Sequence, residues 1–142
     1  TTPSIWNYAE MAAADSMLNT PPTFGIYLLG KILAWVQSQG GLAGMAKRNE
    51  EKASALYSFI DGSCYYSNPV EPGSRSRMNV PFLQANPELD KQFVAEAASA
   101  GLTNLAGHRS VGGMRASIYN AMSLDGVNAL IEFMKEFERT HG

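Results

Sequence analysis

The hydrophobic positions of the chain recur at helical spacing in several stretches, and the clearest stretch lies at the C-terminal end. Five apolar residues there are three or four positions apart, as one buried helix face requires: Val127, Leu130, Ile131, Met134 and Phe137. Ser123 precedes them, and its hydroxyl suits an N-cap, which accepts a hydrogen bond from an unpaired backbone N–H group. We therefore predict a helix that begins after Ser123.

Two more helices are predicted in the first half of the chain. Thr20-Pro21 suits the N-cap and first position of a helix that runs to about Gln39, and Gly40-Gly41 ends it. Because residues 24–36 are apolar around most of the circumference, this helix needs cover from another segment. The next helix ends at Asp61-Gly62, and seven positions make its predicted buried face: Leu42, Met45, Asn49, Ala53, Leu56, Phe59 and Ile60.

Shorter segments of the second half alternate as strands do. A short strand begins at Tyr65, and residues 78–83 form another, in which Pro81 favours an edge position because proline has no N–H to donate. Residues 102–105 and 114–119 are further predicted strands.

One more helix is predicted between these strands. It begins at Asn86-Pro87 and has an apolar stripe of Leu89, Phe93 and Ala97. Together these elements predict a two-layer α+β domain, preceded by long helices, with the helices over one face of the sheet.

Composition limits the classes of function. The 142 residues are 45% hydrophobic, which is enough for one ordinary core. A formal net charge of -2 gives no field that would attract nucleic acid or an anionic membrane surface, so we expect neither as a partner. The single cysteine, Cys64, cannot form an intrachain disulfide and fits a reducing compartment, so we expect a cytoplasmic location. No signal peptide and no stretch long enough to span a bilayer is recognisable.

The segment from Gly107 to Arg115 carries the strongest candidate chemistry. His108 and Arg109 lie in a glycine-rich turn, while Arg115 lies on the strand that follows. Guanidinium groups bind carboxylate and phosphate through paired hydrogen bonds, so this spacing suggests a ligand with two acidic ends. An exposed basic hairpin with no ligand is the open alternative.

A second candidate is the segment Asn19-Thr20-Pro21-Pro22-Thr23. It is either a plain helix cap or a cap whose free donors also bind a phosphate at the positive end of the helix. Metal ligation is not expected, because the two histidines are not at metal-ligand spacing, and Cys64 has no basic neighbour that would activate it.

Three blocks of the sequence resemble the phosphoserine aminotransferases of bacterial type. They are Asn19 to Thr23, Arg75 to Phe82, and Gly107 to Met122, and they occur in the family's order over nearly the whole chain. The resemblance implies a homodimeric enzyme of the α/β PLP-dependent transferase fold, dependent on pyridoxal 5'-phosphate (PLP). Its reaction would transfer an amino group between L-glutamate and 3-phosphohydroxypyruvate, giving O-phospho-L-serine and 2-oxoglutarate. The resemblance places this reaction in serine biosynthesis and, in bacteria, also in pyridoxine biosynthesis.

The resemblance also assigns roles to particular residues. His108 and Arg109 would hold the substrate phosphate across the dimer, and Arg115 would pair with the substrate α-carboxylate. Asn19 and Thr20 would reach the PLP phosphate of the neighbouring subunit.

The family's Schiff-base lysine precedes the Asn19 block, whereas every lysine of this chain follows that block: Lys31, Lys47, Lys52, Lys91 and Lys135. We therefore expect no catalytic residue here, and a chain that corresponds to the C-terminal part of the enzyme and is inactive alone. Residues 1–41 would be a connector and interdomain helix from the cofactor-binding domain, and residues 42–142 the C-terminal small domain. Two other interpretations stay open: an autonomous anion-binding module and a dimerisation domain.

Overall fold

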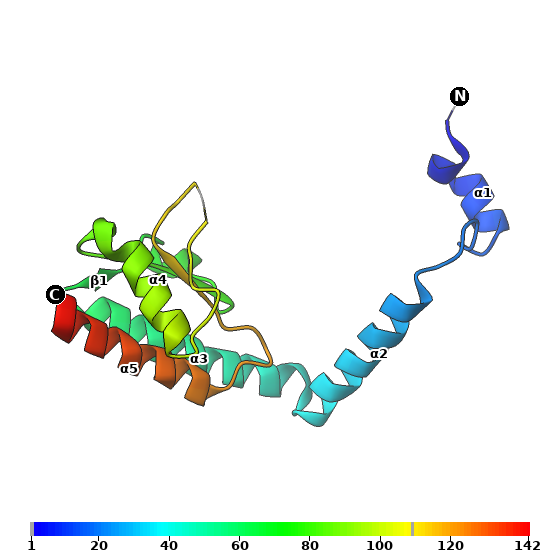
Figure 1. Ribbon diagram of the computed structural model, residues 1–142. Coiled ribbons are helices and arrows are strands. Elements are labelled where there is room, and N and C mark those ends of the chain that lie inside the picture. The colour runs from blue at the N-terminus through cyan, green and yellow to red at the C-terminus, as the bar shows by residue number, and fades with distance from the viewer. Residues whose placement is uncertain (1, 109) are drawn as a thin grey trace. The chain divides into compact units, whose positions relative to one another are not determined.

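The structure, a computed structural model, describes residues 2–108 and 110–142. The chain divides into two compact units, Thr1–Gly41 and Leu42–Gly142 (Figure 1). The first unit contains a short 3-10 helix η1 (Ser4–Trp6) and helices α1 (Tyr8–Ala13) and α2 (Thr23–Ser38). No helix among the described residues is long and apolar enough to cross a membrane.

Helix α2 begins at Thr23 and not at Pro21, which corrects the prediction of Thr20 as its N-cap. Pro22 takes the N-cap position without a side-chain hydrogen bond, and Thr23 N donates to Pro21 O at 2.8 Å. A residue before a proline is disfavoured in the helical backbone region, so Pro22 keeps Pro21 out of the helix. Thr20 lies in the preceding loop.

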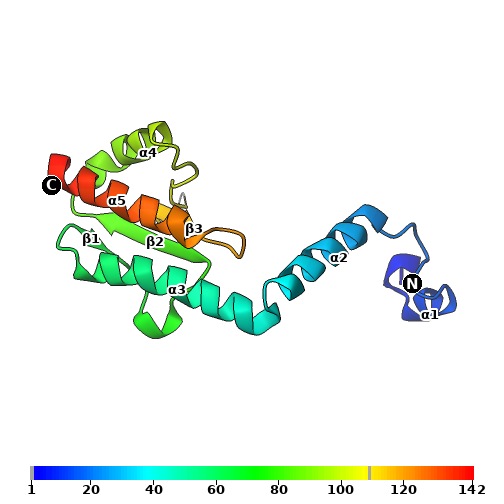
Figure 2. The same ribbon diagram turned by 90° about the horizontal axis from the view of Figure 1, so that it is seen from below.

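The second unit holds a three-stranded antiparallel sheet in the order β1-β2-β3. Its elements follow one another along the chain as α3 (Gly41–Gly62), β1 (Tyr66–Ser67), η2 (Pro72–Ser74), β2 (Asn79–Gln84), η3 (Pro87–Leu89), α4 (Asp90–Ser99), β3 (Met114–Ser117) and α5 (Leu124–His141). Figures 1 and 2 show α3, α4 and α5 gathered around the strands, with the C-terminus beside β1.

Among the residues that the structure describes, the helices cover one face of this sheet. Val80 and Phe82 on β2 and Met114 and Ala116 on β3 are buried, and they pack in one core with residues of α3, α4 and α5. The alternate positions are half-buried and define what we call the open face: Asn79, Pro81, Leu83, Arg115 and Ser117. The predicted two-layer α+β arrangement is therefore confirmed.

The last helix also agrees with its pattern. All five residues of the predicted stripe on α5 are buried, and Ser123 Oγ accepts a hydrogen bond from Gly126 N at 3.1 Å. The α5 stripe meets an aromatic cluster in which the rings of Tyr66, Phe82 and Phe93 pack edge to face.

Pro81 lies on the central strand, so its predicted edge position was wrong. The missing N–H is tolerated because β1 is only two residues long and pairs with β2 at Leu83 and Gln84, short of Pro81. The Pro81 carbonyl accepts instead from the side-chain amide of Asn68, at 2.6 Å. A side chain thus completes the ladder where a proline interrupts it.

Two other sequence predictions need correction. Residues 102–105 form no strand, because Asn104 adopts a left-handed φ of 62°, and only an isolated bridge joins Ala106 to Met114. Leu42, expected on the buried face of its helix, is 85% exposed, whereas Lys52 is fully buried. Lys52 Nζ donates to the carbonyls of Ile118 at 3.0 Å and Tyr119 at 2.7 Å.

Candidate functional site

A cavity of about 340 Å³ lies over the open face of the sheet, within the second unit. Strands β2 and β3 supply Asn79 and Arg115 to its lining, and the two neighbouring loops supply Ser76 and His108. The structure thus brings together two of the residues that the sequence singles out, His108 and Arg115. Arg109 lies outside the described residues.

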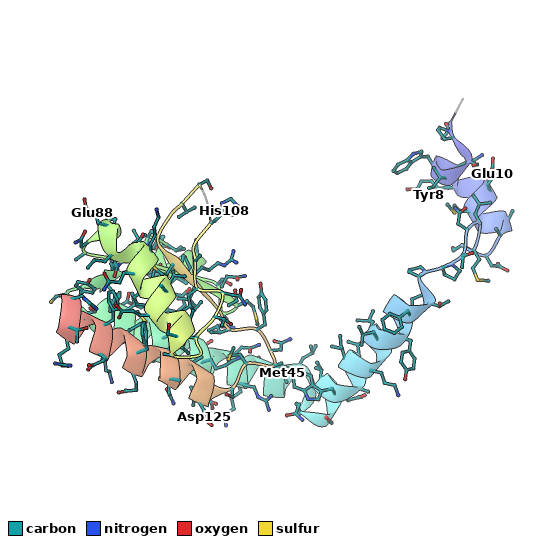
Figure 3. All side chains as sticks on the ribbon, viewed as in Figure 1. Tyr8, Glu10, Met45, Glu88, His108 and Asp125 are labelled. Atoms are coloured by element: carbon teal, nitrogen blue, oxygen red, sulfur yellow. The ribbon has the colours of Figure 1, made fainter. Side chains whose placement is uncertain are left out.

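The loop before β3 carries His108 on a tight turn (Figure 3). The His108 carbonyl accepts hydrogen bonds from Val111 N and Gly112 N, both at 2.9 Å, and ring atom Nδ1 lies 2.7 Å from Ser110 Oγ. Both hydrogen-bond contacts of the ring are made by Nδ1, and the ring's Nε2 has no hydrogen-bond partner among residues 2–108 and 110–142. The imidazole is exposed and is held from one side, with its other nitrogen available to a ligand.

Glycine is required where this loop closes. Gly107 N donates to Gly113 O at 2.9 Å, and a Cβ on Gly107 would overlap the carbonyl oxygen of Gly112. Gly112 and Gly113 have left-handed φ values of 76° and 61°, a conformation that other residues rarely adopt. These glycines fix the start of β3, and therefore the position of Arg115, relative to His108.

Arg115 shows the clearest sign of a missing partner. Its backbone N–H donates to Leu105 O at 2.8 Å, which fixes the residue on the strand. Its side-chain Nε is buried and has no hydrogen-bond partner among the described residues. A buried donor without a partner costs about 1–3 kcal/mol, so such groups are rare unless a ligand or water satisfies them. A carboxylate would satisfy this one, because it accepts two parallel guanidinium hydrogen bonds.

Asn79 is a cavity residue that sequence reasoning missed. Its side-chain Oδ1 lies 3.3 Å from both Ser117 Oγ and Tyr119 Oη, which donate to it from the neighbouring strand and the turn beyond. The available signal was its polar position in the alternating β2 pattern, inside the Arg75 to Phe82 block.

A cluster on α3 anchors the loop that carries Ser76. Arg75 forms a two-pronged ion pair with Asp61, at 2.6 and 2.8 Å, and its guanidinium lies 4.7 Å from the centre of the Tyr57 ring. The Tyr57 hydroxyl donates to the Ser76 carbonyl at 2.9 Å. The hydrogen bond from Arg75 lowers the pKa of Asp61, and burial raises the pKa of Tyr57. The cluster therefore fixes one wall of the cavity.

Asn19 and Thr20 lie in the first unit, in the exposed loop before α2. Neither side chain has a hydrogen-bond partner within the part of the chain that the structure describes, and no side chain caps the 16-residue helix that follows. A hydroxyl, an amide and unpaired N–H groups at a helix start are donors of the kind that a phosphate group accepts from.

Within 2–108 and 110–142, no three histidine, cysteine or acidic side chains are grouped closely enough to hold a metal ion. Cys64 is a free, exposed thiol.

The sequence and the fold of this chain match a known family. Residues 1–130 match the family model "Aminotransferase class-V", so the chain belongs to the class-V aminotransferases. Among curated relatives, it is 59% identical over 140 residues to the phosphoserine aminotransferase of Marinomonas sp. (strain MWYL1), covering 99% of this chain and 39% of that protein. It is 58% identical over 136 residues to that of Haemophilus ducreyi, covering 96% of this chain and 38% of that protein.

Solved structures agree. A phosphoserine aminotransferase from Bacillus circulans subsp. alkalophilus superposes with a TM-score of 0.92 at 44% identity, covering 99% of this chain and 39% of that one. A PLP-bound phosphoserine aminotransferase from Trichomonas vaginalis superposes with a TM-score of 0.85 at 40% identity, over 94% of this chain and 39% of that one. The resemblance seen in the sequence is confirmed, and the chain spans about two fifths of the length of these relatives.

Proposed function

We propose that this chain forms the substrate-binding part of a phosphoserine aminotransferase. The reaction would transfer an amino group between L-glutamate and 3-phosphohydroxypyruvate, giving O-phospho-L-serine and 2-oxoglutarate. The observation that carries this proposal is the unpaired, buried Nε of Arg115, in a cavity that His108 also lines.

The proposed roles follow from the two ends of the ligand. Arg115 pairs with the α-carboxylate, which both the amino acids and the keto acids of the reaction carry, so it serves every substrate. His108, together with Arg109, binds the phosphate that only the serine-side substrates carry. The basic-hairpin alternative leaves the buried Arg115 Nε without explanation, and we therefore prefer the ligand.

PLP would be held in part by Asn19 and Thr20, whose free side chains precede an uncapped helix. When bound, PLP supplies the electron sink that lets an amino group move between two acids. We propose that the lysine that binds PLP covalently lies outside this chain, and that residues 1–41 belong with the cofactor-binding domain. In the same proposal the enzyme is a homodimer, with Asn19 and Thr20 serving the neighbouring subunit.

The surroundings of Lys52 support the proposal that the PLP-binding lysine lies outside this chain. Its ammonium group is enclosed in the core of the second unit and donates to two backbone carbonyls, away from the cavity. A lysine committed in this way anchors the fold and is a poor candidate for the covalent PLP site. The other lysines are on helices, and none is among the cavity-lining residues named above.

The biological setting belongs to the same proposal. The reaction serves serine biosynthesis and, in bacteria, pyridoxine biosynthesis. A cytoplasmic location is consistent with the single free thiol of Cys64.

Activity of a longer polypeptide tests the proposal. This chain, extended to the length of its relatives (the extended polypeptide), is expected to transfer the amino group of glutamate to 3-phosphohydroxypyruvate, and to hydroxypyruvate far more slowly. The isolated chain is expected to be inactive and to bind phosphoserine weakly in calorimetry. Tight binding by the isolated chain would favour an autonomous anion-binding module, and an extended polypeptide without transfer activity would refute the proposal.

A further inference from the structure

Within the described part of the chain, the side-chain amide of Asn79 is hydrogen-bonded through its oxygen and not through its nitrogen. Its Oδ1 accepts from the hydroxyls of Ser117 and Tyr119, which occupies the acceptor end of the amide. Its Nδ2, with two protons to donate, has no hydrogen-bond partner among residues 2–108 and 110–142. The two hydroxyls therefore orient the amide and leave its donors for another group.

The register of the strands places these donors next to Arg115. Asn79 is paired with Ser117, and Pro81 is paired with Arg115, so Asn79 and Arg115 are diagonal neighbours on the open face. Diagonal neighbours in an antiparallel pair are about 7–8 Å apart at the backbone, which is within reach of long polar side chains. Both residues line the same cavity.

A carboxylate suits this pair of donors. Its two oxygens offer about four acceptor sites, of which a guanidinium fork uses two. We propose that Asn79 is a further substrate-contact residue, whose amide donates to the same α-carboxylate that Arg115 binds. This inference rests on the proposed function, and it assigns Asn79 to the end of the ligand that all four substrates share.

The competing explanation is purely structural. Asn79 would then only tie β2 to the turn after β3 through Ser117 and Tyr119, and its replacement would weaken every ligand equally. The two explanations differ in whether the loss depends on the ligand's carboxylate, so a comparison between two ligands separates them.

The test uses two ligands that do not react, with the extended polypeptide and PLP. 3-Phosphoglycerate carries a phosphate and a carboxylate, and glycerol 3-phosphate has a hydroxymethyl group in place of the carboxylate. Calorimetry gives the ratio of their dissociation constants, which we write as the constant of glycerol 3-phosphate divided by that of 3-phosphoglycerate. In Asn79→Ala we expect this ratio to fall about tenfold, because a hydrogen bond to a charged group is lost only with 3-phosphoglycerate.

Two further variants keep the test decisive. Asn79→Asp retains the shape and both acceptor contacts but replaces the donors by a negative charge, so 3-phosphoglycerate binding is expected to fall further still. Asn68→Ala is the matched control: this asparagine donates to Pro81 O from outside the cavity lining, and its loss is expected to leave the ratio unchanged.

Each result decides one question. Equal losses for both ligands in Asn79→Ala, or an unchanged ratio in Asn79→Asp, would overturn the role of Asn79 while the proposed function stands. A wild-type protein that binds both ligands equally would instead contradict the carboxylate site itself, and with it the proposed function.

Discussion

Lys52 and Arg115 each have a buried side-chain nitrogen in the second unit, but the surroundings of these two atoms differ. The Lys52 ammonium donates to two carbonyls of the protein, whereas the buried Nε of Arg115 has no partner among the described residues. Burial lowers the pKa of Lys52, because desolvation disfavours the charged form, and the two carbonyls offset part of that penalty. We therefore regard Lys52 as a structural residue, whereas the unpaired Nε of Arg115 beside the cavity supports the proposed role in ligand binding.

The role of Lys52 can be tested by stability. Lys52→Met keeps most of the volume but leaves the carbonyls of Ile118 and Tyr119 without their donor, so the free energy of unfolding is expected to fall by about 2 kcal/mol. Denaturant unfolding measures it. Lys47→Met, at an exposed position on the same helix, is the control and is expected to change stability by less than about 0.5 kcal/mol. Equal effects of the two replacements would show that the buried hydrogen bonds contribute nothing.

The ion pair of Asp61 and Arg75 makes the anchored loop sensitive to acid. The pKa of Asp61 in the folded protein is lowered from its ordinary value of 3.8, mainly by the Arg75 hydrogen bond. A carboxyl group with a depressed folded pKa stabilises the fold above the unfolded pKa, and that stabilisation is lost as pH falls through the folded pKa. The stability difference between wild type and Asp61→Asn should therefore be constant near neutral pH and shrink below about pH 3.8. A difference that grows on acidification would contradict this assignment.

The predicted helices and strands agree best with the structure where residues close together in the sequence determine the element. Helix α5 has a regular apolar stripe and a serine cap, and both were predicted because each is a pattern of residues close together in the sequence. The start of α2 was predicted wrongly because Pro22 constrains Pro21, a local effect that the helix-start pattern did not weigh. Residues 102–105 do not form the predicted strand because Asn104 adopts a left-handed backbone conformation.

Other features depend on residues far apart in the sequence. The central place of Pro81 is possible because β1 stops short of it and Asn68 supplies a donor. The contacts of Asn79 come from β3 and the turn beyond, so neither its orientation nor its place in the cavity was visible before the register was known. Sequence motifs located His108 and Arg115, and the fold was needed to show that they share one cavity.

The loop that joins His108 to Arg115 depends on Gly107. Gly107→Ala places a Cβ on the Gly112 carbonyl, so the turn must open and binding of phosphorylated ligands by the extended polypeptide is expected to weaken at least tenfold. Gly62→Ala is the matched control, since a Cβ there meets nothing within 4 Å. Calorimetry with 3-phosphoglycerate measures both variants. Unchanged binding in Gly107→Ala would show that the loop geometry does not matter to the ligand.

The two units of the molecule bury their apolar residues to different degrees. The second unit has a continuous core, whereas seven large apolar residues of α2 are between 47% and 74% exposed: Phe24, Ile26, Tyr27, Leu28, Leu29, Ile32 and Leu33. A helix that is apolar over most of its surface is normally covered by other protein. This agrees with a chain that spans about two fifths of the length of its relatives.

The central claim is that His108 and Arg115 bind opposite ends of a doubly charged ligand. The two half-reactions of the extended polypeptide test it most directly. Single-turnover kinetics give kcat/KM separately for glutamate and for phosphoserine. His108→Ala is expected to lower the value for phosphoserine at least tenfold and leave that for glutamate nearly unchanged, while Arg115→Lys lowers both, because lysine cannot supply the paired donors. Equal losses for both substrates in His108→Ala, or no loss for either in Arg115→Lys, would contradict the account.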